Sequence, residues 1–187
     1  MVRNGRMAAA MVVSCVALAA CGNQKAENAA TMAKSAAQAQ VNPTLSTTDA
    51  TFINMAATSG IEEVTFGQLA QTRASSRAIR DFASNMVADH TSANQRLMAL
   101  ASAKQITPAT SMDSAHEATY QTLQGLRGHA FDKAYMDGQV QDHQMVVQSF
   151  QQEATSGTDP DVKAFAQQML PTLQQHLTMA QKLDPRR

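Results

Sequence analysis

Apolar residues recur every three or four positions along four long segments, and this spacing restricts the fold more than any other feature of the chain. The segments cover about residues 49–73, 76–104, 129–156 and 160–183. The second segment carries a typical stripe, formed by Phe82, Met86, Ala93, Leu97 and Leu100. A helix with one apolar face is stable when that face is buried against another element, so the pattern predicts long helices that pack together.

The connections indicate how these helices follow one another. Short turns after the first and third segments predict two antiparallel hairpins, with Pro160 at the first position of the last helix. Residues 106–128 form a longer connection that contains a short helical pattern over about 113–126. Two hairpins joined by one long crossover are typical of ferritin-like proteins. We therefore expect an all-α, ferritin-like four-helix bundle over residues 48–184, with a short extra helix in the long crossover connection.

The beginning of the chain predicts an exported protein. Arg3 and Arg6 precede an uncharged run of 14 residues, Met7 to Ala20. A membrane-spanning helix needs about 20 apolar residues, whereas a basic start, a short apolar run and small residues at its end are typical of a signal peptide. Residues 18–21 read LAAC, which resembles the lipobox of bacterial lipoproteins. The resemblance implies cleavage after residue 20 and acylation of Cys21.

A lipid anchor decides the expected location. Acyl chains on Cys21 hold a protein on a bilayer without spanning it, so we expect a membrane partner and a place in the cell envelope, facing the periplasm. Gly22 follows the acylated residue, and among lipoproteins a residue other than Asp there favours the outer membrane. Residues 21–47 are small and polar, and we interpret them as the acylated Cys and a flexible tether.

Composition excludes several classes of function. The chain has 15 basic and 15 acidic residues, no cluster of Lys and Arg, and 4% aromatic residues, which argues against nucleic-acid binding. Cys15 lies in the predicted signal peptide, so after acylation of Cys21 the domain has no thiol for catalysis or metal binding. No phosphate-binding loop or hydrolase motif is present either, which favours a non-catalytic role. The sequence identifies no protein partner.

Each long helix places one ionisable residue on its apolar stripe. These residues are Glu63, His90, His143 and His176, at levels that agree within about one helical turn when counted from the hairpin turns. A carboxylate with imidazoles suits a transition metal ion such as zinc, copper, iron or nickel. The same residues also suit a polar layer that fixes helix register without a metal, or boundary positions on the helices. The metal-free layer is the favoured interpretation, so no cofactor is assigned.

Two Asp-His pairs, Asp89-His90 and Asp142-His143, occur at matching places on the second and third long helices. Neighbouring helical residues point about 100° apart, so each Asp faces away from its own His. The Asp side chains either orient a His of a neighbouring helix, as carboxylates around metal sites do, or are solvated. Solvation is the favoured interpretation. His116 and His129 are interpreted as surface residues.

Nearly the whole predicted domain, about residues 52–183, resembles a widespread bacterial family of exported ferritin-like domains without an assigned function, often labelled as outer-membrane proteins. The motifs that carry the resemblance are GIEEV at 60–64, GQLA at 67–70, FA at 82–83, MVADH at 86–90, FD at 131–132, Tyr135, DH at 142–143, LPTL at 170–173 and HL at 176–177. The resemblance implies a helical bundle in the envelope and no particular reaction. The Glu-x-x-His pairs of di-iron bundles are absent from the sequence, which argues against ferroxidase chemistry.

These observations leave two hypotheses of function. The leading one is an envelope lipoprotein whose helical bundle is a non-catalytic binding or structural module. The alternative is a ferritin-like metal-binding or redox protein of the periplasm that uses Glu63, His90, His143 and His176, with Asp89 and Asp142 behind them.

Overall fold

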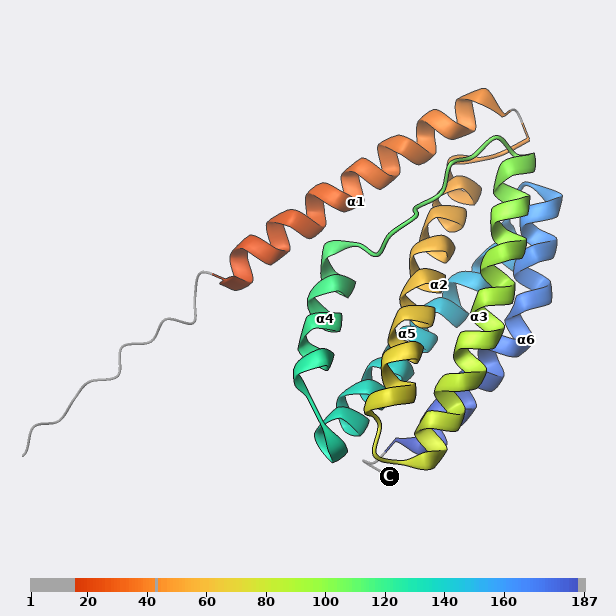
Figure 1. Ribbon diagram of the computed structural model, residues 1–187. Helices are drawn as coiled ribbons and strands as arrows, with labels where there is room; N and C mark the ends of the chain where they lie inside the picture. Colours follow the sequence, from red (N-terminus) through yellow and green to blue (C-terminus); the bar gives the residue numbers. More distant parts are fainter. Residues whose placement is uncertain (1–15, 43, 185–187) are drawn as a thin grey trace, which may run out of the picture.

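The computed structural model describes residues 16–42 and 44–184, with side chains from residue 25 onward, and every regular element in these ranges is a helix (Figure 1). The helices are α1 Val16–Val41, α2 Thr47–Arg73, α3 Arg77–Ala103, α4 Ser114–Gly125, α5 Gly128–Ser156 and α6 Pro160–Leu183. The prediction of an all-α protein is confirmed, and the short extra helix α4 lies in the connection where the sequence predicts it.

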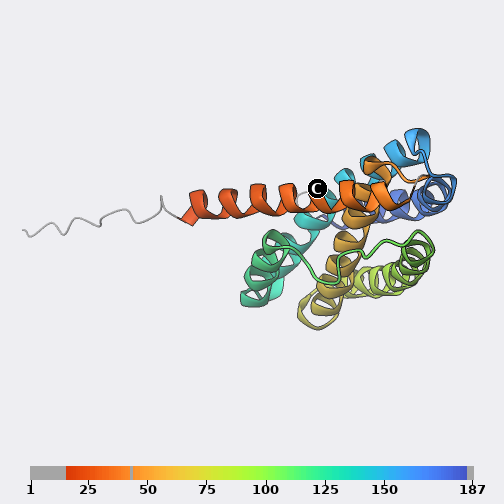
Figure 2. The same ribbon diagram turned by 90° about the horizontal axis from the view of Figure 1, so that it is seen from above.

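Four long helices form the body of the molecule. α2 packs along α3 and α5 packs along α6, and the two hairpins meet through α2 against α5 and α3 against α6. The connection between the hairpins runs along the length of the body through α4, so that α3 and α5 point in the same direction (Figure 1). α4 lies against α2 and α5, and α1 crosses the outside of the body over α2 and α4 (Figure 2).

Polar side chains fix the ends of these helices. Ser46 and Asp49 form a capping box at the start of α2. Asp159 accepts hydrogen bonds from the backbone N–H groups of Asp161 and Val162, and Pro160 stands at the start of α6. Each cap satisfies N–H groups that have no partner within the helix, and the sequence therefore determines where the helix begins.

The start of α3 is capped from another helix. Asp132, on α5, accepts hydrogen bonds from Ser75 N–H at 2.8 Å, Ser75 Oγ at 2.5 Å and Ser76 N–H at 3.0 Å. Asp132 is only 5% exposed, because the turn between α2 and α3 folds over it. A single carboxylate thus joins one hairpin to the other.

The segment expected to be a flexible tether is a helix in this structure. Residues 22–41 belong to α1, which is rich in Ala, the residue with the highest helix propensity. Its polar face packs on α2, where Asn54 Nδ2 lies 3.3 Å from Ser35 Oγ and 3.1 Å from Gln38 Oε1. Ser35 is fully buried in this contact. The helix is attached through hydrogen bonds rather than an apolar stripe, which is why hydrophobic periodicity does not reveal it.

The buried side chains form two apolar clusters at different levels of the body, with a polar layer between them. One cluster contains Leu97, Val147 and Leu173, and the other contains Met86, Val140 and Ala180. On α2 the same boundary falls between Ala57 and Phe66, at the buried Glu62 and Glu63. The ionisable residues of the stripes therefore lie at a single level, as their spacing predicts.

Within the described residues, no helix is both long and apolar enough to cross a bilayer. Most of the predicted signal peptide lies outside these residues, because the description begins at residue 16. The backbone of Cys21 belongs to α1, but its side chain is not described. Acylation of Cys21 stays a prediction.

Candidate metal centre

Three histidines from three helices meet in the polar layer. His90 on α3, His143 on α5 and His176 on α6 are 7%, 1% and 1% exposed. Their ring centroids lie 5.4 Å apart for His90 and His176, 5.6 Å for His143 and His176, and 5.9 Å for His90 and His143. One ring nitrogen from each histidine lies within 4.8 Å of the other two. Among the side chains that the structure describes, no other group of three potential metal ligands converges in this way.

Two of the rings are held by oxygen atoms. His143 Nδ1 lies 3.0 Å from the carbonyl oxygen of Gln139, and His176 Nε2 lies 2.9 Å from Asp89 Oδ2. Carbonyl and carboxylate oxygens only accept hydrogen bonds, so both of these ring nitrogens donate. Asp89 thus contacts a histidine of a neighbouring helix, although its side chain is 49% exposed.

For His143 and His176, the hydrogen bond donated by one ring nitrogen leaves the lone pair on the other nitrogen. His143 Nε2, His176 Nδ1 and His90 Nε2 are buried and have no hydrogen-bond partner in the protein. A buried polar atom without a partner costs about 1–3 kcal/mol. The side-chain oxygens of Tyr135 and Gln139 are also buried without a partner, but the three histidines differ from them because their rings converge at one level.

The three imidazoles are neutral at pH 7. Burial lowers the pKa of His90 to about 3, with a further contribution from the two neighbouring histidines. Burial also lowers the pKa of His143 to about 4, and it lowers the pKa of His176. Neutral imidazole is the form that binds metals, so no proton has to leave these rings before they coordinate an ion.

Glu63 lies beside this group but not among the three converging nitrogens. Its Oε1 is 3.4 Å from His143 Nδ1, the nitrogen that already donates to the backbone, and its Oε2 accepts a hydrogen bond of 2.7 Å from Gln139 Nε2. Burial raises the pKa of Glu63 to about 8. The carboxyl group therefore contacts the outer edge of the His143 ring rather than the space between the histidines.

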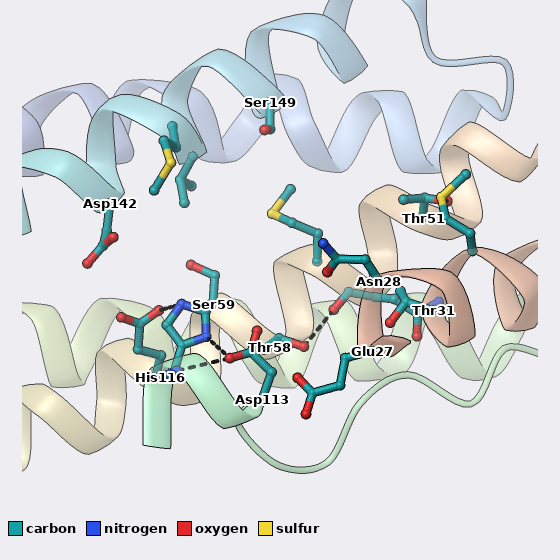
Figure 3. A pocket seen from close by; sticks show the side chains of 16 residues that line it. Glu27, Asn28, Thr31, Thr51, Thr58, Ser59, Asp113, His116, Asp142 and Ser149 are labelled. Atoms are coloured by element: carbon teal, nitrogen blue, oxygen red, sulfur yellow. Dashed lines mark hydrogen bonds and ion pairs between the residues drawn. The ribbon is translucent and has the colours of Figure 1, made fainter. Parts of the chain in front are cut away.

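A second group of ionisable residues lies next to the first and faces a pocket between α1, α2, α4 and α5 (Figure 3). Glu62 is 2% exposed, and its Oε2 lies 3.0 Å from His116 Nε2. Asp113, the N-cap of α4, is 2.7 Å from the other nitrogen of His116. Asp142 shares a hydrogen bond with Glu62 and interacts electrostatically with both His116 and His143. Burial and the nearby carboxylates raise the pKa of Glu62 to about 10.

Sequence reasoning missed Glu62 and His116. The burial of Glu62 could have been predicted, because this residue shares one side of α2 with Met55, Phe66 and Leu69 at helical spacing. His116 carried none, since its contact depends on where the long connection places α4. It is not a free surface residue, although its side chain is 30% exposed. His129 is exposed, as expected.

The three histidines match the ligand set of a mononuclear transition-metal site. Imidazole nitrogens bind zinc, copper, iron and nickel, and three histidines with an open fourth position are a known zinc arrangement. In a tetrahedral zinc site with Zn–N bonds near 2.0–2.1 Å, the nitrogens lie about 3.4 Å apart. Small rotations of the rings would bring nitrogens that are now within 4.8 Å to that spacing.

Comparison with known proteins gives a family but no activity. The family described as "Domain of unknown function (DUF4142)" matches residues 30–183, which include the second half of α1 and all the other helices. No curated protein and no solved structure matches the chain.

Proposed function

Since the chain belongs to the family of the domain of unknown function DUF4142, which assigns it no activity, we propose a function from its side chains: it is an envelope lipoprotein whose helical bundle binds one divalent transition-metal ion through His90, His143 and His176. The observation that carries the proposal is the set of three buried imidazole nitrogens without hydrogen-bond partners, on rings that converge within one layer.

This proposal is favoured over a metal-free polar layer because of how the rings are partnered. A polar layer that only fixes helix register gains stability when its members hydrogen-bond one another, since unpaired buried groups are costly. No hydrogen bond between two of the three histidines occurs here, and each ring keeps an unpaired nitrogen. A metal ion removes that cost by accepting all three lone pairs.

Zinc fits this ligand set best, and a binding role fits it better than redox chemistry. Zn²⁺ takes three imidazoles readily and has no geometric preference from d electrons. Di-iron bundles instead use several carboxylates together with Glu-x-x-His pairs, and here no carboxylate belongs to the converging group. The ferritin-like arrangement itself is part of the proposal. The parallel direction of α3 and α5 across the long connection supports it.

Metal analysis of the purified protein tests this function. We expect about one Zn²⁺ per chain after equilibration with Zn²⁺ and gel filtration. His90→Ala and His143→Ala should lose the ion, while the matched control His129→Ala, which changes an exposed histidine of α5, should retain it. Circular dichroism checks that each variant is folded. A parent protein that binds no stoichiometric metal would refute the function.

The anchor at Cys21 is a separate part of the proposal. It is supported by the basic start of the chain, the apolar run that follows and the LAAC sequence at 18–21. Metabolic labelling with a fatty acid should mark the parent protein and not Cys21→Ser, and the label should fractionate with the outer membrane. Equal labelling of both proteins would contradict lipidation at this residue.

A further inference from the structure

The pocket beside the histidine layer is acidic. Its volume is about 580 Å³, and four carboxylates from separate parts of the chain line it: Glu27 of α1, Glu62 of α2, Asp113 at the start of α4 and Asp142 of α5 (Figure 3). Among the described residues that line the pocket there is no Lys or Arg. Burial raises the pKa of Glu62 to about 10, so this group keeps its proton at pH 7, and the negative charge of the pocket comes chiefly from Glu27 and Asp113. Charges of one sign on a concave surface raise the local concentration of ions of the opposite sign, so these two side chains attract cations to the pocket.

A second, smaller cavity, lined mostly by apolar side chains, shares two lining residues with this pocket and reaches one of the three histidines. Its volume is about 20 Å³, and its lining includes His90 together with Ser59 and Val146. Ser59 and Val146 also line the large pocket. The two cavities therefore adjoin, and the side chains of these two residues stand between the acidic pocket and the ring of His90.

We propose that the acidic pocket is the vestibule through which a hydrated divalent cation reaches the three histidines, with Ser59 and Val146 as the narrow passage. The inference rests on the proposed metal-binding function and adds the route and the form in which the ion arrives. The unpartnered nitrogens of His90, His143 and His176 are its destination.

The two volumes indicate where the ion loses its water. A cavity of about 15 Å³ holds one water molecule, so 580 Å³ admits an ion with its full hydration shell, whereas 20 Å³ admits the ion with one water or none. The side chains of Ser59 and Asn94 are the oxygen donors that line the smaller cavity, and they replace part of the lost water. The imidazoles then take the ion.

A chain of close contacts leads inward from the partly exposed Asp113 to the buried Glu62. Asp113 contacts His116, His116 contacts Glu62, and Glu62 shares a hydrogen bond with Asp142. Beside them, Glu63 contacts His143 at 3.4 Å. The neighbouring residues Glu62 and Glu63 therefore contact the pocket group on one side and the His143 ring on the other.

The rate of uptake tests the vestibule separately from the site. Stopped-flow mixing of the purified metal-free protein with Co²⁺, followed by the absorbance of the bound ion, gives the association rate. The double variant Glu27→Gln with Asp113→Asn removes two rim charges, and Asn at 113 still caps α4. We expect uptake to slow about 3–10-fold and to become less sensitive to salt, while the metal content at equilibrium stays at one ion per chain.

Two further variants complete the experiment. Glu117→Gln removes a carboxylate of α4 that does not line the pocket, and its uptake should match the parent protein. Val146→Ala widens the passage and should speed uptake. If the double variant and Val146→Ala both take up Co²⁺ at the parent rate, the pocket is not the route of entry. The proposed binding site is unaffected by that result. A parent protein that never binds Co²⁺ or Zn²⁺ would overturn both.

Discussion

At the scale of single residues, hydrogen bonds from one ring nitrogen each orient His143 and His176. Asp89 fixes His176 from α3, and the backbone at Gln139 fixes His143 from one turn earlier on α5. Such partners determine which nitrogen carries the proton and which is free to coordinate, and they strengthen the ligand. Asp89 can be changed without touching a proposed ligand.

Asp89→Ala should weaken Zn²⁺ binding about 10–100-fold, because His176 loses the acceptor that holds its ring and its tautomer. The free energy of unfolding of the metal-free protein should change little, since the Asp89 side chain is half exposed. Competition with a chelator of known affinity measures the binding, and Asp81→Ala, an exposed carboxylate of the same helix, is the control. Equal affinities in the two variants would contradict this role.

Glu153 gives a pH dependence that is independent of the histidines. Burial, and then the hydrogen bond and charge of Asp49, raise its pKa to about 7 from an ordinary value of 4.5. The folded protein thus holds this proton more tightly than the unfolded chain, so its contribution to stability is present below about pH 4.5 and is lost as the pH rises through about 7. Between these values the parent protein should lose stability relative to Glu153→Gln.

Urea unfolding of the parent protein and Glu153→Gln at several pH values measures this difference directly. The variant amide still donates a hydrogen bond toward Asp49 but does not titrate. Other groups that titrate in the same range contribute equally to both proteins and cancel. A stability difference that stays constant from about pH 5 to pH 8 would show that Glu153 has no raised pKa.

At the scale of helices, the sequence predicts what periodicity and caps control. The bounds of α2, α3, α5 and α6 agree closely with the predicted segments, because apolar stripes fill the interior of each helix. Side-chain caps determine where α2 and α6 begin, and Pro160 follows the cap of α6. Helix α1 is not predicted from apolar periodicity, because it is attached to α2 by hydrogen bonds of Asn54 with Ser35 and Gln38. Hydrogen bonds between distant segments leave no periodic trace in a sequence.

Asp132→Ala should reduce the free energy of unfolding by about 1–3 kcal/mol, because three donors of Ser75 and Ser76 at the start of α3 lose their acceptor. Urea denaturation measures the change. Asp81→Ala, whose side chain is 70% exposed in an ion pair, should change stability by less than about 0.5 kcal/mol. If both variants have the same stability, the cap across the two hairpins contributes nothing.

At the scale of the whole molecule, the polar layer could be predicted and the pocket could not. Each histidine of the layer lies on an apolar stripe, so helical geometry alone brings the three to one level. The pocket depends on α1 and on the path of the long connection, which places His116 against Glu62. Neither path follows from local periodicity, because both are set by contacts between segments far apart in the sequence.

A chain that begins at Thr44 should still fold and bind one Zn²⁺. Neither buried apolar cluster contains a described residue of α1, and no proposed ligand lies on it. The melting temperature should fall, because Asn54 loses its partners on α1. Circular dichroism measures the folding and the melting temperature, and metal analysis measures the bound Zn²⁺. Loss of cooperative unfolding would mean that α1 is part of the core.

The layer of histidines also spans the boundary between the two hairpins, since His90 belongs to α3 whereas His143 and His176 belong to α5 and α6. An ion bound by all three histidines would be a cross-link between the two hairpins. A ligand that binds only the folded state adds about 2.7 kcal/mol of stability when it is present at 100 times its dissociation constant. On the proposed function, the free energy that holds the two hairpins together would therefore depend on the concentration of free metal ion.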